Sequence, residues 1–339
     1  MLDISVVIPT CNRRERLLAQ LRRLCGSTHP VREVLVVDSS DDKLAAADLA
    51  PFSSLPVRYI EAPRSVCIQR NIGIRAASSP WILLLDDDNE LPADYLARLS
   101  DHIAAHPEAG AVSGLVLEPR DGDWHAQFPE TSDLVLLWKY LFKLGLWGEL
   151  HPRSRLGQMV AARYRSAGNH LAKSGWPVIV EMEAPFFRVP IYTLGASLVK
   201  QQWLLASPYD ETLESHGLGD NYDVAIGFPD EGIHVLADVH VRHHHAPENR
   251  LAAATAAERR MLALDYFIRT RPSLAARGVR PAWFLWSLVG AAVLHGAGGH
   301  GAMARAFGRT LWEVIRGRNP YLDGRGAAAF ERPAARGGR

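Results

Sequence analysis

Three consecutive aspartates, Asp86, Asp87 and Asp88, follow an apolar run, Trp81–Leu85, in the sequence WILLLDDDN. A continuous apolar run is typical of a buried parallel strand, and ligands of open α/β sheets bind just beyond the carboxyl ends of such strands. Adjacent carboxylates repel one another unless a positive group lies between them, and Mg²⁺ and Mn²⁺ prefer oxygen ligands. The pattern therefore predicts a metal site at the edge of a sheet. The alternative is a solvated acidic turn that precedes a helix over residues 92–99.

The elements that would position these acids alternate along the first 120 residues. We expect strands at 4–8, 33–37, 57–60, 82–85 and 111–117, and helices at 14–24 and 66–77. Pro9 is expected to end the first strand. Strands that alternate with helices build a mostly parallel central sheet with flanking helices, so the predicted fold class is α/β.

The second half of the chain is less regular. Residues 121–190 are rich in Trp, Tyr and Phe, and such a segment forms either the walls of a binding site or surface packing. Sheet-like and turn-like patterns return at 190–200, 217–228 and 235–245, and 258–270 has a helical pattern. The Gly- and Arg-rich residues after Asp323 are predicted to be disordered.

Composition and length limit the possible classes of protein. The 38 Lys and Arg residues nearly balance the 37 Asp and Glu residues, which argues against a nucleic-acid partner. A chain of 339 residues is expected to form one large domain with an appended segment. The three cysteines have no metal-site spacing and indicate a reducing compartment, and the first ten residues do not resemble a signal peptide. We therefore expect a cytoplasmic protein.

One apolar stretch, residues 281–298, raises the question of membrane contact. It is slightly shorter than the roughly 20 apolar residues that span a bilayer, so a buried or interfacial helix is favoured over a transmembrane one. Trp283 and Trp286, with Arg277 and Arg280 nearby, would suit the inner face of a membrane.

A second helix, predicted at 302–316, places Phe307, Leu311 and Ile315 on one face with arginines close by. Such a helix could lie on anionic lipid, and its alternative is an amphipathic helix packed on the main domain. A peripheral membrane contact is thus left open by two neighbouring segments.

Four segments then occur in order: VVIPTCNR, VVDSSDD, RNIGIRAASSPWILLLDDDNELPADYL and GASLVKQQWLLASPYDETL. Over residues 4–270 the chain resembles the family 2 glycosyltransferases, which have the GT-A fold. The resemblance implies an inverting transfer, dependent on Mn²⁺ or Mg²⁺, of a sugar from a nucleotide-diphosphate donor, with a UDP-sugar favoured. The acceptor would be a saccharide, lipid-linked or small-molecule hydroxyl.

The resemblance, with the residue pattern beyond it, predicts a division of the chain. Residues 1–120 would form the nucleotide-sugar-binding half of a GT-A domain and 121–250 its acceptor-binding and catalytic half. Residues 251–322 would be a helical C-terminal extension, and 323–339 a disordered tail.

Nucleotide-binding roles follow from the matching positions. In similar enzymes the loop that here contains Pro9, Thr10 and Arg13 touches the nucleotide, and a hydroxyl and a guanidinium suit that role. Asp38 resembles the aspartate that accepts a hydrogen bond from the base; its alternative role is a turn cap. Arg70 resembles the residue that steadies the nucleotide or its phosphates.

Asp86 and Asp88 match the two acids of the family's Asp-x-Asp pattern. The first would face the ribose and the second would bind the metal ion, which lowers the barrier by neutralising the departing diphosphate. Asp87, between them, is grouped with the nucleotide-binding residues.

His243 resembles the histidine that completes the metal or diphosphate site after a short strand. Period-two alternation places it on one face with Val239 and Val241, opposite His240 and Arg242. A zinc site built from His240 and the three consecutive histidines that begin at His243 is the rival interpretation.

The general base is the least regular part of the match. The family usually supplies it from a Glu-Asp-x-Asp stretch, whereas this chain has Asp220-Asn221-Tyr222-Asp223, and Asn221 cannot accept the proton. We expect Asp220 to be the base, with Asp223 as the second candidate. A capped loop with no catalytic role is the alternative.

Other function classes remain open at this point. A catalytically inactive sugar-nucleotide-binding protein would retain Asp38, Arg70 and Asp88. A nucleotidyltransferase would usually show a Gly-rich phosphate loop after the first strand, where this chain has PTCNRRER, and no GxGxxG follows that strand to indicate a dinucleotide enzyme.

Overall fold

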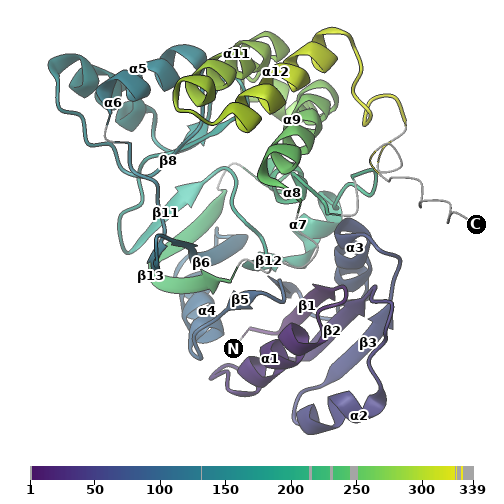
Figure 1. Ribbon diagram of the computed structural model, residues 1–339. Coiled ribbons are helices and arrows are strands. Elements are labelled where there is room, and N and C mark those ends of the chain that lie inside the picture. Colours follow the sequence, from purple (N-terminus) through teal and green to yellow (C-terminus); the bar gives the residue numbers. More distant parts are fainter. Residues whose placement is uncertain are drawn as a thin grey trace, which may run out of the picture.

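The computed structural model of the chain describes residues 2–130, 132–213, 216–229, 232–244, 251–324, 326 and 330. Its central feature is a twisted, mixed sheet with the strand order β11-β13-β6-β12-β4-β1-β2-β3, to which β5 and β7 add at β13 and β6 (Figure 1). The strands are β1 (Ile4–Thr10), β2 (Glu33–Asp38), β3 (Val57–Glu61), β4 (Trp81–Leu85), β5 (Asn89–Glu90), β6 (Ala111–Arg120), β7 (Asp123–His125), β11 (Phe186–Val189), β12 (Ala196–Lys200) and β13 (Ile233–His243).

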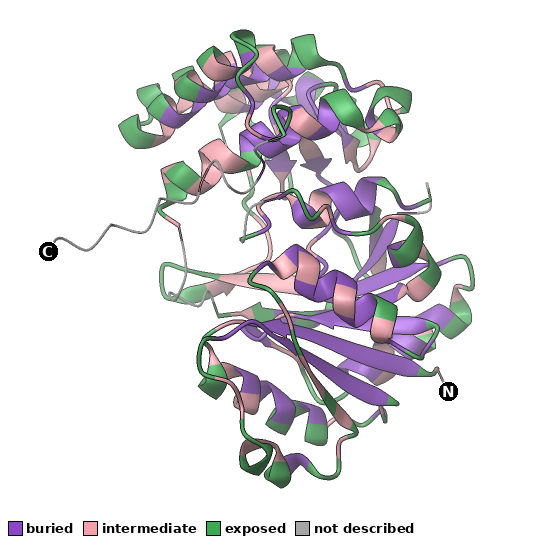
Figure 2. Ribbon diagram, turned by 90° about the vertical axis from the view of Figure 1, so that its right-hand side faces the viewer, coloured by how far each residue is buried: buried purple, intermediate pink, exposed green. Residues whose placement is uncertain are grey.

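The first half of the sheet forms as the sequence predicts. Strands β4, β1, β2 and β3 pair in parallel; the residues of β1, β2 and β4 are buried on both faces, whereas the apolar residues of the edge strand β3 are half-buried (Figure 2). β12 then enters antiparallel between β4 and β6, while β13 pairs in parallel with β6. The class is therefore α/β, with a sheet that is parallel in its first half and mixed in its second.

The prediction that Pro9 ends the first strand is wrong. β1 continues to Thr10, with Pro9 opposite Val37 of β2. Proline lacks an N–H to donate, but β4 stops pairing with β1 at Val7, so this part of β1 needs hydrogen bonds on one side only.

Helices cover both faces of the sheet. α1 (Arg14–Cys25) and α4 (Tyr95–Ala105) lie on one face, and α3 (Val66–Ala76), α7 (Gln201–Ala206) and α8 (Asp220–Ile226) lie on the other. Gly73 lets α3 approach β1 closely, because a Cβ atom there would lie 2.4 Å from a methyl group of Val7. The small elements α2 (Ala46–Leu49) and η1 (Ala50–Phe52) connect β2 to β3.

The assignment of residues 217–228 to sheet-like and turn-like structure is wrong for its second part, which is helix α8. Gly219 adopts a left-handed conformation, with φ of 98°, directly before the helix. A seven-residue helix after a glycine-rich run has too few turns to show a helical period.

A helical cap lies on the side of the molecule opposite α1 and α2 (Figure 1). It contains α5 (Asp133–Phe142), α6 (Arg155–Ala167), α11 (Pro281–Ala297), α12 (Gly301–Ile315) and a small sheet of β8 (Leu146–Trp147), β10 (Pro177–Ile179) and β9 (His170–Leu171). α9 (Ala253–Thr270) and α10 (Pro272–Ala276) join the cap to the α8 side of the main sheet.

The two helices that raised the membrane question lie in this cap. Within the described residues, no helix is long and apolar enough to cross a membrane. α12 packs against α9 and α11 and buries Phe307, whereas Ile315 at its end is 62% exposed. The predicted disordered tail after Asp323 lies almost entirely outside the described residues.

Candidate active site

The loop after β4 places its three acids in different surroundings. Asp87 is 3% exposed, accepts a hydrogen bond from Thr10 Oγ1 at 2.8 Å and lies 2.9 Å from Arg13 Nη1. Burial, opposed by the charge of Arg13, raises the pKa of Asp87 to about 6. Arg13 also lies 3.6 Å from Asp88, whereas Asp86 points to the other side. Arginine thus relieves part of the repulsion between the acids, and that repulsion alone does not require a metal ion.

His243 reaches Asp88 from the end of β13. The backbone of His243 is in register with Asn89 of β5, so the strand delivers the imidazole beside the aspartate loop. Its Nε2 lies 3.5 Å from Asp88 Oδ1 and its Nδ1 lies 3.0 Å from Glu118 Oε1. Burial lowers the pKa of His243, but the hydrogen bonds to the two carboxylates outweigh it and raise the pKa to about 9. The predicted alternation is present, since Val239 and Val241 are buried.

The other histidines of the segment do not join this site. His240 is exposed, and His244 Nε2 lies 2.6 Å from Glu90, while His245 is outside the described residues. In the described part of the chain, no group of three or more His, Cys, Asp or Glu side chains could hold a metal ion. Asp88 and His243 alone would leave most positions of a divalent ion to oxygen atoms of a bound ligand, which is how Mg²⁺ is commonly held beside phosphates.

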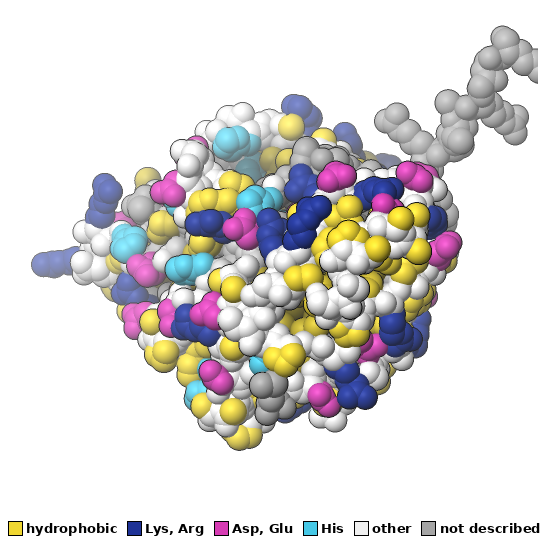
Figure 3. Space-filling model, turned by 90° about the horizontal axis from the view of Figure 1, so that it is seen from below, with side chains coloured by type: hydrophobic (Ala, Val, Ile, Leu, Met, Phe, Trp, Pro, Cys, Tyr) yellow, Lys and Arg dark blue, Asp and Glu magenta, His cyan; other side chains and the backbone are white. Residues whose placement is uncertain are grey.

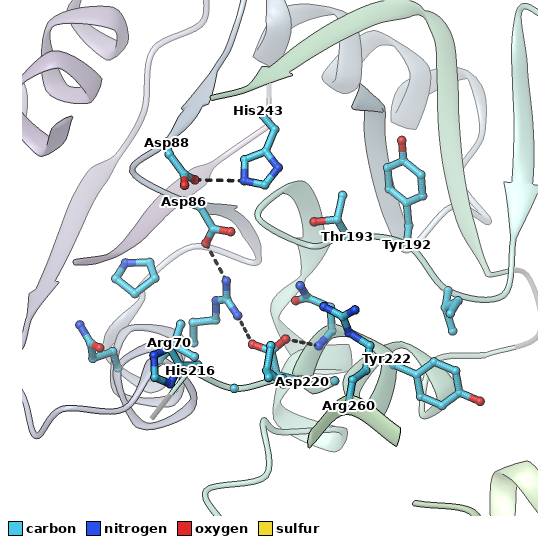
Figure 4. Close-up of a pocket in the computed structure, with 18 of the residues that line it drawn as sticks. Arg70, Asp86, Asp88, Tyr192, Thr193, His216, Asp220, Tyr222, His243 and Arg260 are labelled. Carbon is cyan, nitrogen blue, oxygen red and sulfur yellow. Dashed lines mark hydrogen bonds and ion pairs between the residues drawn. The ribbon is translucent and has the colours of Figure 1, made fainter. Parts of the chain in front are cut away.

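Arg70 connects acids from two distant parts of the chain. It extends from α3, is 4% exposed, and its Nη2 lies 2.6 Å from Asp86 Oδ1. Its Nη1 donates to Asp220 Oδ2 (Figure 4). The guanidinium also lies over the Tyr209 ring, 5.1 Å from the centroid. Burial would lower the pKa of Arg70, but Asp86 and Asp220 raise it well above its ordinary value. Arg70 is therefore a permanent cation between the two carboxylates.

Asp220 and Asp223 both come from α8 but face different partners. Asp220, the first residue of the helix, lies in the cavity described below, and its Oδ1 accepts a hydrogen bond from the Asn221 N–H at 2.6 Å. Burial, only partly offset by Arg70, raises the pKa of Asp220 to about 6. Asp223 binds Arg271 through both oxygens, at 2.7 and 2.8 Å, and does not line the cavity. Of the two candidate bases, only Asp220 is placed to meet a ligand.

These groups surround one cavity of about 820 Å³ between the main sheet and the helical cap (Figure 4). Its lining includes most of the predicted site residues: Pro9, Thr10, Arg13, Arg70, Asp86, Asp87, Asp88, Asp220 and His243. Asp38 and Asp223 are the two predicted residues that do not line it. A cavity of this size holds a small-molecule ligand.

Asp38 is occupied within the protein. It is 1% exposed, its Oδ1 accepts hydrogen bonds from the N–H and hydroxyl of Ser40, and its Oδ2 accepts one from Tyr59 at 2.6 Å. The alternative role of a turn cap therefore describes this conformation, and the contact with a nucleotide base remains a prediction.

Several lining residues were not singled out from the sequence. The far wall is aromatic, with Trp147, Trp176, Tyr192 and Tyr222. Only the general richness of residues 121–190 in aromatic side chains pointed to a wall of this kind. Arg260, from α9, also lines the cavity and has no hydrogen-bond or ion-pair partner among the described residues. No motif marks an isolated arginine on a helix.

Comparison with known proteins gives a consistent result. Residues 5–159 match the sequence model described as glycosyl transferase family 2. The chain is 31% identical over 111 residues to an uncharacterized glycosyltransferase of Haemophilus influenzae, a match that covers 32% of this chain and 37% of the relative. It is 29% identical over 143 residues to the succinoglycan biosynthesis protein ExoM of Rhizobium meliloti, covering 37% of this chain and 46% of the relative. Both matches span less than half of the relative's length.

A solved structure shows the same fold. The crystal structure of GalNAc-T7 with UDP, GalNAc and Mn²⁺ is similar with a TM-score of 0.53 at 15% identity, over 95% of this chain and 58% of that one. At this identity the similarity concerns the fold alone, and it confirms the predicted α/β class of GT-A type.

Proposed function

We propose that this chain transfers a sugar from a nucleotide-diphosphate donor to an acceptor hydroxyl with inversion, using a divalent metal ion, because residues 5–159 match the sequence model of glycosyl transferase family 2. The observation that supports this most strongly is the convergence of the acids after β4, Arg70 of α3, Asp220 of α8 and His243 of β13 on one cavity. Elements far apart in sequence supply these groups, so their meeting follows from the fold and not from local chain geometry.

The donor would bind along the edge formed by β1 and β4. Pro9, Thr10 and Asp86 would contact the nucleotide, with Arg13 holding Asp87 in place. Asp38 would reach the base only if a small movement exposes it, since both of its oxygens are occupied. We propose a UDP-sugar because the structural neighbour GalNAc-T7 was crystallised with UDP.

Asp88 and His243 would hold Mn²⁺ or Mg²⁺ together with the donor phosphates. Their facing atoms are 3.5 Å apart, close to the roughly 3 Å expected for two neighbouring ligands at about 2.1 Å from one ion. A divalent ion there would neutralise the charge that develops on the leaving diphosphate. His243 must lose its proton to ligate, so binding should release a proton near neutral pH.

Asp220 would accept the proton of the attacking acceptor hydroxyl. A carboxylate offers about four lone-pair positions, and Arg70 and the Asn221 N–H occupy one on each oxygen. Each carboxylate oxygen can therefore accept one further hydrogen bond, which the hydroxyl of the acceptor substrate would donate. A pKa of about 6 leaves Asp220 ionised at pH 7 but more basic than an ordinary aspartate, which suits general base catalysis.

The acceptor would lie against the aromatic wall beyond Asp220. Trp147 stacks on Tyr192, with ring centroids 5.7 Å apart, and Tyr222 donates to a backbone carbonyl, so the wall is rigid. Arg260 projects into this side of the cavity, and Asp220 is the carboxylate that favours its charge (Figure 4). We propose that Arg260 contacts the acceptor. A saccharide, lipid-linked or small-molecule acceptor fits this description.

The proposal is tested by calorimetric titration of UDP, GDP and dTDP into the chain, each with and without Mn²⁺, and into the Asp88→Ala variant. We expect one nucleotide to bind with a metal requirement that Asp88→Ala removes. Asp94→Asn, which changes an exposed acid between β5 and α4, is the control and should bind as the wild type does. Binding that ignores both metal and Asp88 would rule out the proposed donor site.

A sugar-nucleotide-binding protein without turnover is the second candidate, because Asn221 stands where the family has its aspartate. Hydrolysis of a UDP-sugar to UDP separates the two. An enzyme loses this activity in Asp220→Asn while it retains nucleotide affinity, whereas a binding protein shows no turnover in either form.

A further inference from the structure

The outer surface of the helical cap carries exposed apolar side chains on two helices. On α5, Leu134 is 80% exposed and Leu141 is 51% exposed. On α11, Trp286 is 45% exposed and Val293 is 50% exposed. The spacing of seven residues within each helix places each pair on one side of its helix. We refer to these four residues as the apolar stripe.

The two halves of the stripe are held side by side. The Trp286 indole N–H donates to the Leu141 carbonyl at 3.1 Å, and its ring stacks on Phe142 with centroids 4.5 Å apart. Further along, the Trp138 indole N–H donates to the Gly290 carbonyl at 2.9 Å. The stripe is therefore a continuous surface across two rigidly connected helices.

The α11 part of this surface lacks charged residues. α11 contains no Asp, Glu, Lys or Arg, so its exposed side has no charged residue. Single exposed apolar residues are common on soluble proteins, but a contiguous apolar patch marks an interaction surface. By contrast, the face seen in Figure 3 intersperses acidic and basic side chains.

One end of the stripe is basic. Trp283, 37% exposed, lies in the first turn of α11, and the ammonium groups of Lys143 and Lys173 lie 5.8 and 6.0 Å from the centre of its ring. Arg280, also exposed, precedes the helix. Neither lysine has an acidic partner among the described residues. Tryptophan beside lysine and arginine is the pattern of a protein surface at the headgroup level of a membrane.

We propose that the apolar stripe and its basic end bind the surface of a membrane that contains anionic lipid, without spanning it. The apolar side chains would enter the boundary between headgroups and acyl chains, and the three bases would contact lipid phosphates. Charge favours lipid over a second copy of the chain, because a self-contact would bring the bases toward α11 of the other copy, which carries no acid.

This surface is connected to the cavity. Ser287 lies on the inner side of α11 and accepts a hydrogen bond from the indole N–H of Trp176, which lines the cavity. The same helix thus forms the outer surface and supports the cavity wall. A bound membrane would lie on the opposite side of α11 from that wall. The proposal itself does not depend on the proposed enzymatic activity.

The test is flotation of the full chain with vesicles of phosphatidylcholine alone and with about 30% phosphatidylglycerol, at about 0.1 M and 0.5 M salt. We expect binding to the anionic vesicles only, weakened at high salt. The variant Leu134→Gln/Leu141→Gln/Val293→Gln should bind at least about tenfold more weakly, because it removes three side chains that would enter the lipid. Lys143→Gln/Lys173→Gln removes two of the three proposed contacts with lipid phosphates. This variant should therefore bind anionic vesicles as weakly as neutral ones.

The matched control is Leu205→Gln, since Leu205 on α7 is as exposed as Leu141 but lies outside the stripe. It should bind vesicles as the wild type does, and all variants should keep the wild-type circular dichroism and melting temperature. Equal binding by the triple variant and the wild type, or no binding by the wild type, would overturn the proposal. So would a wild-type dimer that the triple variant dissociates, because the stripe would then be a protein interface.

Discussion

The proposed role of Asp220 predicts how activity depends on pH. A base must be ionised, and burial raises the pKa of Asp220 to about 6. About nine tenths of the molecules are then ionised at pH 7 and about one tenth at pH 5, so kcat/KM should fall roughly tenfold between these values. An unperturbed aspartate, with a pKa of about 3.9, would show no decline in this range. The assay is release of UDP from a UDP-sugar, measured from pH 5 to 8.

Substitution of Arg70 provides a second test, because it should change the pKa of Asp220. Its charge lowers the pKa of Asp220 from the value that burial alone would give, and an opposite charge at this distance is worth about 1–3 pH units. Arg70→Gln should therefore move the acid limb of the pH–activity profile, which is the fall in kcat/KM below pH 7, to higher pH by at least about one unit. Arg70→Lys retains the charge and should leave the limb near pH 6. The position of the limb is informative even where the maximal rate falls.

Asp220→Asn decides whether this assignment is correct. It should lower kcat by about 100- to 10,000-fold, and the residual rate should be flat from pH 5 to 7. Asp223→Asn, whose carboxylate faces Arg271 outside the cavity, should keep the limb. If the Asp220→Asn residual activity keeps the same limb, the titrating group is another one, and Asp87, with its pKa also raised to about 6, is the first to test.

Three further predictions concern other sites. His243→Gln should weaken Mn²⁺-dependent nucleotide binding at least about tenfold in calorimetry while leaving metal-free binding unchanged; equal loss in both would make His243 a nucleotide contact instead. Arg260→Gln should raise the KM for acceptor about tenfold without changing the KM for donor, and the reverse result would place Arg260 on the donor. Glu33, whose pKa is lowered to about 2 by hydrogen bonds that outweigh its burial, should stabilise the fold above pH 4.5 and lose this effect as the pH falls toward 2. Glu33→Gln should therefore cost up to about 3 kcal/mol in urea unfolding at pH 7, and the exposed Glu61→Gln should cost less than about 0.5 kcal/mol.

The part of the cavity formed by the loop after β4 could be predicted because its signals are local. An apolar run that ends in Asp86, Asp87 and Asp88 identifies both a strand and the edge at which it stops. Burial of parallel strands on both faces produces such runs, so strand ends and acids are visible in the same few letters. Arg70 and Asp220 were singled out only by resemblance, and their ion pair joins residues 150 positions apart.

The rest of the site depends on contacts that no local pattern records. Trp147 and Trp176 line the cavity because the small sheet of the cap pairs β8 with β10. Asp38 has the expected position at the end of β2, yet its orientation depends on Tyr59 of the neighbouring strand. α5 shows the same limit, since no element was predicted within residues 121–190 and no local pattern shows that Leu134 and Leu141 face solvent.

The position of β12 has a consequence for how the chain can be divided. The family match ends at residue 159, but β12, at Ala196–Lys200, lies between β4 and β6 in the finished sheet. A fragment that ends at 159 would contain β4 and β6 with no strand to join them. During synthesis β6 emerges well before β12, so the sheet closes only after a long-range insertion, which is a slow step in folding. The segment that matches the family model is therefore not a unit of folding, and a fragment trimmed to it should be prone to aggregate through two unpaired strand edges.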